Sequence, residues 1–151
     1  MGKRIAVVTG GIGGLGTEIC RALAQAGRTV IAVDLESRQE RIAAFAQEVQ
    51  GLDIRFAAAN VADYDRCGEL VRSIEEEHGA LDILVNNAGI IAPIGHLEHL
   101  TSDSLLPAFE VNVIGLHRMT VACLPLLKQS QGQQEQVVAK LLDLSCYTGT
   151  S

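Results

Sequence analysis

The chain has 151 residues, of which 48% are hydrophobic and only 3% aromatic, and its formal net charge is -6. This length suits one domain, residues 1–151, with an aliphatic core, and an acidic chain without basic clusters argues against nucleic acid as a partner. No apolar run reaches the roughly 18 residues of a membrane span and the N-terminus lacks a signal-peptide pattern, so we expect a cytoplasmic protein with no membrane partner.

Short apolar runs alternate with helical patterns along the chain. The runs that predict strands cover residues 5–8, 29–33, 53–58, 81–85 and 137–144. After the first run, Leu15, Ile19 and Leu23 recur at helical spacing until Gly27 ends the helix. Strands that alternate with helices in this way predict right-handed crossovers and a parallel sheet. The expected fold is therefore a Rossmann-like, doubly wound α/β domain of about five strands.

The later helices show similar apolar stripes. The third stripe begins at Cys67, and the longest helical pattern covers residues 102–128. Thr101 is suited to cap the start of this long helix, because a threonine hydroxyl accepts from the first backbone N–H groups. Pro125 is expected to kink or end it, since proline lacks a backbone donor.

The turn after the first strand is rich in glycine. It fits both the general Gly-x-Gly-x-x-Gly dinucleotide fingerprint, which begins at Gly11, and a Thr-Gly-x-x-x-Gly-x-Gly spacing, which begins at Thr9. Glycine lets the backbone approach phosphates, and the N–H groups and dipole of the following helix attract a pyrophosphate. A tight turn without a ligand is the alternative, but the strand before it and the helix after it favour a cofactor. The residues expected to bind it here are Gly10, Gly11, Ile12, Gly13, Gly14, Leu15 and Gly16.

Asp34 ends the second strand about 20 residues after the turn, where dinucleotide-binding domains place the acid that binds the adenosine ribose. Its carboxylate can accept from the 2′- and 3′-hydroxyls, whereas a 2′-phosphate would meet like charge, to which Glu36 adds. We therefore expect NAD rather than NADP. Two alternatives stay open: Asp34 merely caps the strand end, or Arg38 or Arg41 reaches a phosphate.

At these residues the sequence resembles the short-chain dehydrogenase/reductase family. The Thr-Gly-x-x-x-Gly-x-Gly spacing is that family's glycine motif, and the Asn-Asn-Ala-Gly segment at 86–89 resembles its second signature. The Asn-Val pair at 60–61 resembles the family's adenine-contact position. The resemblance covers essentially the whole chain, and the first half looks most like 3-oxoacyl or acetoacetyl thioester reductases. The further cofactor-binding residues that it implies are Asn60, Val61, Asn86, Ala88 and Gly89.

The resemblance implies hydride transfer between NAD(P)(H) and a small carbonyl or alcohol substrate. It also implies a catalytic role for Asn112, which lies between Phe109 and Leu116 at helical spacing and so on the apolar face of the long helix. A buried amide there needs partners. In the family this asparagine holds a water in a proton relay. The alternative from the residues alone is a core asparagine bonded to nearby backbone.

The family's chemistry also needs a serine after the fifth strand and a Tyr-x-x-x-Lys helix beyond it. The serine orients the carbonyl, the tyrosine transfers a proton, and the lysine lowers the tyrosine pKa. Aligning Gly149 with the family's glycine puts Cys146 at the serine position, and the register leaves Ser145 open as the alternative. Tyr147 has serine four residues on, and no Tyr-x-x-x-Lys occurs in the chain. We therefore expect a chain shortened before the family's last two strands.

Two functions follow from these features. The first is a shortened short-chain oxidoreductase whose cofactor half is intact, and the alternative is a catalytically inactive nucleotide-binding or structural module. Because the tyrosine and lysine are missing, we expect no detectable NADH-dependent reduction of acetoacetyl thioesters by the chain alone. A chain that associates with another one supplying both residues stays open as a third interpretation.

The histidines and cysteines predict no metal site. His96 and His99 lie close together in a loop, but no nearby cysteine or aspartate completes a site. The four cysteines lack Cys-x-x-Cys spacing, which is typical of reduced thiols. The apolar edge of the last strand and the helix 102–128, through which the family often dimerises, predict a homo-oligomer.

Overall fold

Five parallel strands form the sheet of the structure, a computed structural model that describes residues 2–91, 93–130 and 136–139. The strands are β1 (Ile5–Thr9), β2 (Thr29–Asp34), β3 (Ile54–Ala58), β4 (Ile83–Asn86) and β5 (Gln136–Ala139). They lie in the order β3-β2-β1-β4-β5, so the chain builds the sheet outward from β1 in both directions. The predicted doubly wound α/β fold is confirmed.

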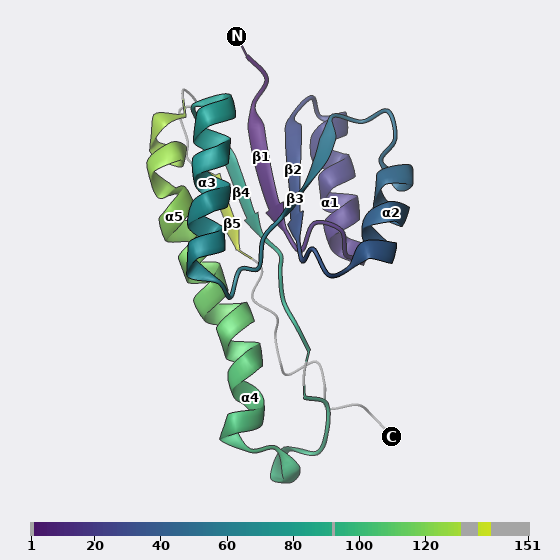
Figure 1. The fold of residues 1–151 in the computed structure, drawn as a ribbon, viewed down its shortest axis with the longest axis vertical. Coiled ribbons are helices and arrows are strands. Elements are labelled where there is room, and N and C mark those ends of the chain that lie inside the picture. Colours follow the sequence, from purple (N-terminus) through teal and green to yellow (C-terminus); the bar gives the residue numbers. More distant parts are fainter. Residues whose placement is uncertain (1, 92, 131–135, 140–151) are drawn as a thin grey trace.

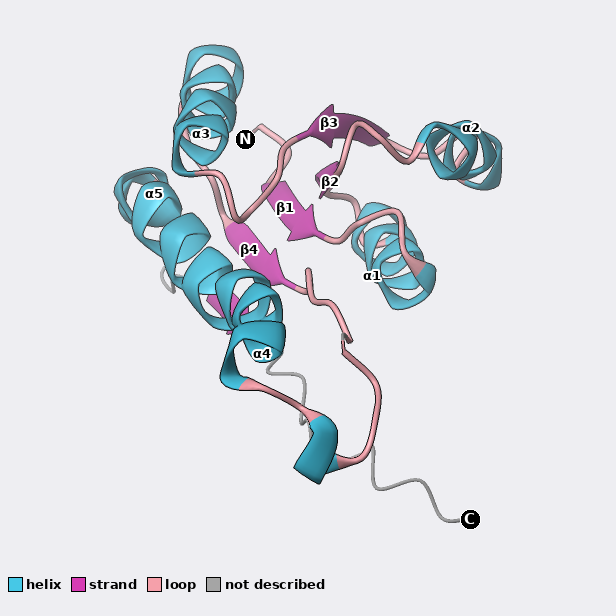
Figure 2. Cartoon of the chain, turned by 60° about the horizontal axis from the view of Figure 1, so that its bottom comes forward, coloured by secondary structure: helices cyan, strands magenta, loops and turns pink. Residues whose placement is uncertain are grey.

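Helices cover both faces of this sheet, as Figure 1 and Figure 2 show. One face carries α1 (Gly14–Gln25) and α2 (Gln39–Glu48), and the other carries α3 (Tyr64–His78) and α5 (Leu116–Gln129). Gly27 and Gly51 follow the first two helices, each with a φ of +83°, which is the left-handed backbone that glycine adopts without strain. The first helix therefore ends where the sequence predicts.

The central strand β1 is buried along its whole length and serves two cores. Val8 packs in the cluster that contains Phe45 of α2, whereas its neighbour Val7 packs in the cluster that contains Met119 of α5. Successive side chains of a strand point to opposite faces, so a strand covered by helices on both sides must be apolar throughout. This is why the strand appears as an unbroken apolar run in the sequence.

Three cysteines of the described residues, Cys20, Cys67 and Cys123, are free and buried. Burial raises the pKa of Cys20 and that of Cys123 to about 12. The reactive thiolate is therefore scarce at neutral pH, and these thiols act as core residues. Cys146 lies outside the described residues.

The long helix is continuous but not uniform. It begins with α4 (Ser102–Phe109), passes through a π-helical segment, η2 (Glu110–Gly115), and continues as α5. Thr101 caps its start as predicted, because the hydroxyl oxygen accepts from the Ser104 N–H at 3.1 Å. A π-helical turn accommodates an extra residue, and this one lies at the middle of the helix.

The long helix does not end at Pro125, contrary to one of the two expectations for that residue. α5 continues to Gln129. Cys123 and Leu126, on either side of the proline, are almost completely buried. Their packing against the body of the protein outweighs the one hydrogen bond that proline cannot make.

All five strands differ from their predicted limits, and β1, β2 and β3 do so by one residue only. β4 begins at Ile83, because the N–H of the buried Leu81 donates to the Leu126 carbonyl, 3.3 Å away, instead of to a neighbouring strand. The last strand comprises residues 136–139. Residues 140–144 of its predicted extent lie outside the described residues.

An arm extends away from the sheet beyond the carboxyl ends of the strands (Figure 1). It consists of residues 90–91 and 93–115, that is, the segment after β4 together with α4 and η2. Its large apolar side chains are between 45% and 79% exposed at Ile94, Leu97, Leu106, Phe109 and Val113. Large apolar side chains thus lie at the surface of the arm.

Candidate functional site

A cavity of about 480 Å³ lies at the carboxyl ends of the strands. At β1 the order of the strands reverses, because β2 and β3 lie on one side of it and β4 and β5 lie on the other. Doubly wound domains bind their ligands at this point of the sheet. The predicted residues that line the cavity are Gly10, Gly13, Gly14, Leu15, Gly16, Asp34, Asn60, Val61, Ala88 and Gly89. The structure thus brings residues from four separate loops to one site.

The glycines of the turn have two different roles. Gly10 has a φ of +62°, and a Cβ at this position would lie 2.9 Å from the Ala88 Cα. A Cβ at Gly16 would lie 2.0 Å from the Gly10 carbonyl oxygen. These two glycines therefore let the turn pack against the start of α1 and the end of β4. Gly14, in contrast, is exposed and a Cβ there would meet nothing within 4 Å, so it keeps space open at the cavity.

Three of the predicted cofactor-binding residues do not line the cavity. Gly11 packs so closely on Ala32 that a Cβ would lie 2.8 Å from its Cα, and the side chain of Ile12 is fully buried in the core. Asn86 is 2% exposed and donates through Nδ2 to the Thr120 hydroxyl at 2.9 Å. Other residues of the same segments line the cavity, whereas backbone direction turns these three toward the interior.

Asn87 lines the cavity although it was not among the predicted cofactor-binding residues. Its Nδ2 donates to the Gly10 carbonyl at 3.1 Å, and its backbone N–H donates to the Thr9 hydroxyl at 3.1 Å. The N–H of Ala88 donates to the same hydroxyl at 3.1 Å. The Oδ1 of Asn87 is buried without a hydrogen-bond partner among the described residues, and a buried acceptor of this kind is available to a ligand. In the sequence, Asn87 could have been identified as a candidate by its place in the Asn-Asn-Ala-Gly segment.

The carboxylate of Asp34 lies at the cavity with 8% of its side-chain surface exposed. One oxygen accepts from the Leu35 N–H at 2.9 Å, and the other accepts from Nη1 of Arg38 at 3.1 Å. Arg38 also lines the cavity. A negative charge and its counter-ion therefore stand side by side where the ribose of a dinucleotide is expected.

Arg41, the other arginine that the sequence leaves open as a phosphate ligand, is engaged elsewhere. Its two Nη atoms donate to the Glu48 carboxylate at 2.7 and 2.8 Å, and its Nε donates to the Ile12 carbonyl. The hydrogen bond from Arg41 holds the pKa of Glu48 below its usual range. Of the two candidate arginines, Arg38 is the one placed at the cavity.

Asn112 lies in η2 and clamps the segment after β4. Its Oδ1 accepts from the Ile90 N–H at 2.8 Å, and its Nδ2 donates to the Ile90 carbonyl at 2.9 Å. The expected burial is wrong, because the asparagine is half-buried and Phe109 is 48% exposed. The π-helical turn shifts the faces of the helix relative to a regular 3.6-residue period. The bonds to backbone agree with the alternative interpretation, and the water-holding role stays a prediction.

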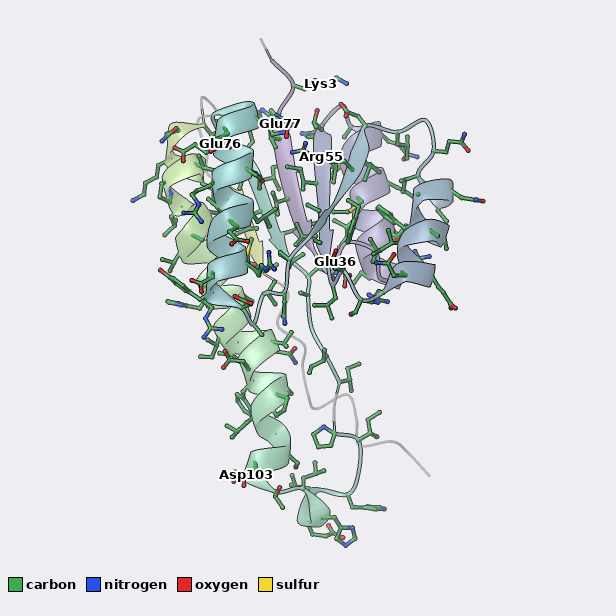
Figure 3. The ribbon with its side chains drawn as sticks, viewed as in Figure 1. Lys3, Glu36, Arg55, Glu76, Glu77 and Asp103 are labelled. Carbon is green, nitrogen blue, oxygen red and sulfur yellow. The ribbon has the colours of Figure 1, made fainter. Side chains whose placement is uncertain are left out.

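Charged side chains also gather at the opposite end of the sheet, far from the cavity. Figure 3 shows Lys3, Arg55 and Glu77 there, whereas Glu36 lies near the cavity end. Arg55 bonds to Glu77 and contacts Nε2 of His78 at 3.2 Å, and it holds the pKa of Glu77 below its usual range. These pairs are partly exposed and join β3 to α3, so they contribute to structure rather than to the cavity.

In the part of the chain that the structure describes, no group of three or more side chains is arranged to hold a metal ion, and the rings of His96 and His99 lie 6.1 Å apart edge to face. Within the same residues, none of the helices is long and apolar enough to cross a membrane.

Comparison with known proteins agrees with this geometry. Residues 4–139 match the family model of the short chain dehydrogenases. An acetoacetyl-CoA reductase of Allochromatium vinosum is 46% identical over 89 residues, which are 58% of this chain and 36% of that protein. A short-chain dehydrogenase/reductase of Burkholderia xenovorans has a TM-score of 0.81 at 25% identity, over 92% of this chain and 59% of that one.

A third similar protein is an alcohol dehydrogenase of the archaeon Thermococcus sibiricus, whose structure was solved in complex with 5-hydroxy-NADP. It has a TM-score of 0.72 at 28% identity, over 87% of this chain and 56% of that one. The chain thus spans between about a third and three fifths of the length of these relatives. The sheet order, the glycine turn and the match over residues 4–139 together establish that the chain belongs to the short chain dehydrogenase family.

Proposed function

We propose that the chain binds NAD in the cavity and is the cofactor-binding part of an oxidoreductase acting on a small carbonyl or alcohol substrate. When bound, the nicotinamide ring supplies the group that accepts or donates hydride. The observation that carries the proposal is the joint placement of the glycine turn and the Asp34 carboxylate in one cavity. The space that Gly14 leaves open fits a polar ligand there, and so does the Oδ1 of Asn87, which has no hydrogen-bond partner among the described residues.

The start of α1 suits the pyrophosphate. The first intrahelical donor is the N–H of Thr17, which bonds to the Gly13 carbonyl at 2.9 Å. The N–H groups of Gly14, Leu15 and Gly16 precede it and have no carbonyl of the same helix to bond to. Three donors and the positive end of the helix dipole therefore lie at the cavity, which is the arrangement that binds phosphate groups in other proteins.

The preference for NAD rests on the surroundings of Asp34. A 2′-phosphate would lie beside a nearly buried carboxylate and would have to displace Arg38 from it, whereas ribose hydroxyls can donate to the carboxylate without breaking the ion pair. Arg38 is the observation that favours NADP, because it is a cation at the cavity. We infer that the repulsion by Asp34 outweighs the attraction by Arg38 and favours NAD, since the charge of Arg38 is already neutralised by Asp34.

Calorimetric titration of the full chain tests this preference, and the absence of tryptophan makes calorimetry more direct than intrinsic fluorescence. We expect NAD⁺ to bind about tenfold more tightly than NADP⁺. The Asp34→Ser variant should lose this preference, because the like charge is removed and Arg38 is freed. Glu76→Gln is the matched control, since Glu76 is exposed on α3 and is not part of the cavity lining. Equal or tighter binding of NADP⁺ by the unmodified chain would overturn the assignment, and binding of neither would exclude a cofactor site.

The substrate is a separate proposal. The identity to an acetoacetyl-CoA reductase supports a 3-oxoacyl thioester as the substrate class. Tyr64 and Tyr147 are the tyrosines of the chain, and the residues four positions after them are glycine and serine. For these 151 residues by themselves, this favours the second candidate function, nucleotide binding without turnover.

We further propose that the chain self-associates through the arm and α5. Leu106 and Phe109 are 60% and 48% exposed on the same helix, and Val121 of α5 is 51% exposed. Light scattering should show a dimer or larger species, and Leu106→Lys combined with Phe109→Lys should shift it toward the monomer. Tyr64→Lys is the matched control, because Tyr64 is 74% exposed on α3. A monomer at the lowest and highest concentrations tested would contradict the proposal.

A further inference from the structure

The loop between β3 and α3, residues 59–63, forms one wall of the cavity. Ala58, at the end of β3, pairs with Asp34 at the end of β2, and the N–H of Ala59 donates to the Asp34 carbonyl at 3.0 Å. Asn60 and Val61 both line the cavity. Because Asp34 is placed to bind the adenosine ribose, this loop is the wall next to the adenosine half of a dinucleotide.

The loop is held by its own residues on the side of α3. The Oδ1 of Asn60 accepts from the Ala62 N–H at 3.0 Å, and the carboxylate of Asp63 caps α3 by accepting from the Arg66 N–H at 3.1 Å. These bonds define the shape of the loop. They do not fix the distance of the loop from the long helix, which depends on contacts from that helix.

Arg118 of α5 supplies the contact from the long helix. Its Nη1 donates to the Ala62 carbonyl at 2.6 Å and to the Glu110 carboxylate at 2.5 Å. The arginine side chain is 26% exposed and that of Glu110 is 43% exposed. One guanidinium nitrogen thus joins the start of η2, the start of α5 and the backbone of the loop, and a hydrogen bond from a charged donor is stronger than a neutral one.

Gly115 allows the helix and the loop to approach closely enough for this contact. A Cβ on Gly115 would lie 2.8 Å from Cγ2 of Val61 and 3.1 Å from its carbonyl oxygen. Val61 is 6% exposed and belongs to the core. The position of the loop is therefore set from two sides, by the close packing at Gly115 and by the bond from Arg118.

The same helical segment also holds the opposite end of the cavity. Asn112 bonds to both backbone groups of Ile90, which lines the cavity after β4. Residues 110–118 therefore contact the wall of the adenosine half through Arg118 and the other half through Asn112. The two contacts come from different side chains, so substitutions can test the two halves of the site separately.

We propose that Arg118 is a positioning residue for the adenosine half of the cofactor site, with Glu110 as its counter-ion. Arg118 does not line the cavity and acts through the Ala62 carbonyl, which places Asn60 and Val61. The inference rests on the proposed function, because it takes the cavity to be a dinucleotide site.

The test uses the full chain and the variant Arg118→Met, which keeps a long side chain and removes its donors. ADP is the probe, since it contains the adenosine half and the pyrophosphate without nicotinamide. We expect the dissociation constant for ADP to rise about tenfold, and that for NAD⁺ to rise by the same factor. Arg118→Lys should recover most of the affinity, because a single nitrogen makes both contacts. Arg72→Met, at an exposed position of α3, is the matched control and should bind as the unmodified chain does.

Amide hydrogen exchange separates positioning from general stability. In Arg118→Met the peptide that covers residues 59–66 should exchange faster, while residues 5–25 keep their protection. Faster exchange everywhere, or ADP affinity within twofold of the unmodified chain, would overturn the proposal. If Arg118→Met does not fold, Glu110→Gln is used instead. We expect this variant to lose about threefold in ADP affinity. Unchanged affinity would refute the role of the Arg118–Glu110 pair. If the unmodified chain binds neither ADP nor NAD⁺, the proposed function fails, and the exchange experiment still decides whether Arg118 holds the loop.

Discussion

Replacing Gly16 with alanine is expected to destabilise the protein by about 3 kcal/mol and to abolish cofactor binding. The new Cβ would lie 2.0 Å from the Gly10 carbonyl oxygen, so the backbone must move. That oxygen accepts from the Gly13 N–H at 3.2 Å and from Nδ2 of Asn87 at 3.1 Å. Moving it breaks both the turn and the link between the turn and the end of β4. Urea denaturation followed by circular dichroism measures the loss.

Gly14 provides the matched control because it is two residues away and its surroundings are open. A Cβ there would meet nothing within 4 Å, and alanine is a better helix former than glycine. Gly14→Ala should therefore fold as stably as the unmodified chain and still bind NAD⁺ at least tenfold more weakly, since the methyl group takes up space at the cavity. Equal stability of Gly16→Ala and Gly14→Ala would contradict the packing role of Gly16.

Gly115→Ala should also destabilise the protein, by about 2 kcal/mol. Replacing a glycine in the middle of a helix with alanine usually has the opposite effect and raises stability. The added Cβ would crowd the Val61 side chain and carbonyl and would lie 3.2 Å from the Glu110 carbonyl oxygen. Val61 is buried and β-branched, so its methyl group cannot simply rotate away. We expect ADP binding to weaken as well, because the displaced residue lines the cavity.

Gly68 serves as a comparison that tests whether the loss of stability in Gly115→Ala comes from the residues packed around Gly115. It lies inside α3, and a Cβ there would meet nothing within 4 Å. Gly68→Ala should therefore stabilise the protein by up to about 1 kcal/mol. Denaturation curves of both variants give the comparison directly. If Gly115→Ala were stabilising to the same extent, the close approach of the long helix to the loop 59–63 would be refuted.

The type and order of the elements could be predicted because each depends on a local pattern. The buried strands are apolar on both faces, and the helices carry apolar stripes that end at residues such as Gly27 and Gly51, where the backbone requires a positive φ. The predicted limits differ mainly where long-range contacts intervene. Leu81 is excluded from β4 by a bond to the long helix, and Pro125 is tolerated because its neighbours are buried.

Which residues line the cavity is harder to predict from the sequence than which segments surround it. The Asn-Asn-Ala-Gly segment indicates a cofactor contact, but only the path of the backbone after β4 shows that Asn87 lines the cavity and that Asn86 turns to Thr120. Asn112 illustrates the same limit. Its expected burial assumed a regular helix, and the π-helical turn that alters its environment has no local pattern by which it is recognised.

The fold class, the family resemblance and the position of the glycine turn could be inferred from the residues alone, because these depend on composition and spacing within short segments. Only the packing of the elements shows that Arg38 and not Arg41 lies at the cavity, and that Arg118 reaches the Ala62 carbonyl from a helix far along the chain. Both outcomes depend on contacts between residues distant in sequence. A long, flexible arginine side chain can reach many partners, and which of them it meets is set by how the elements pack.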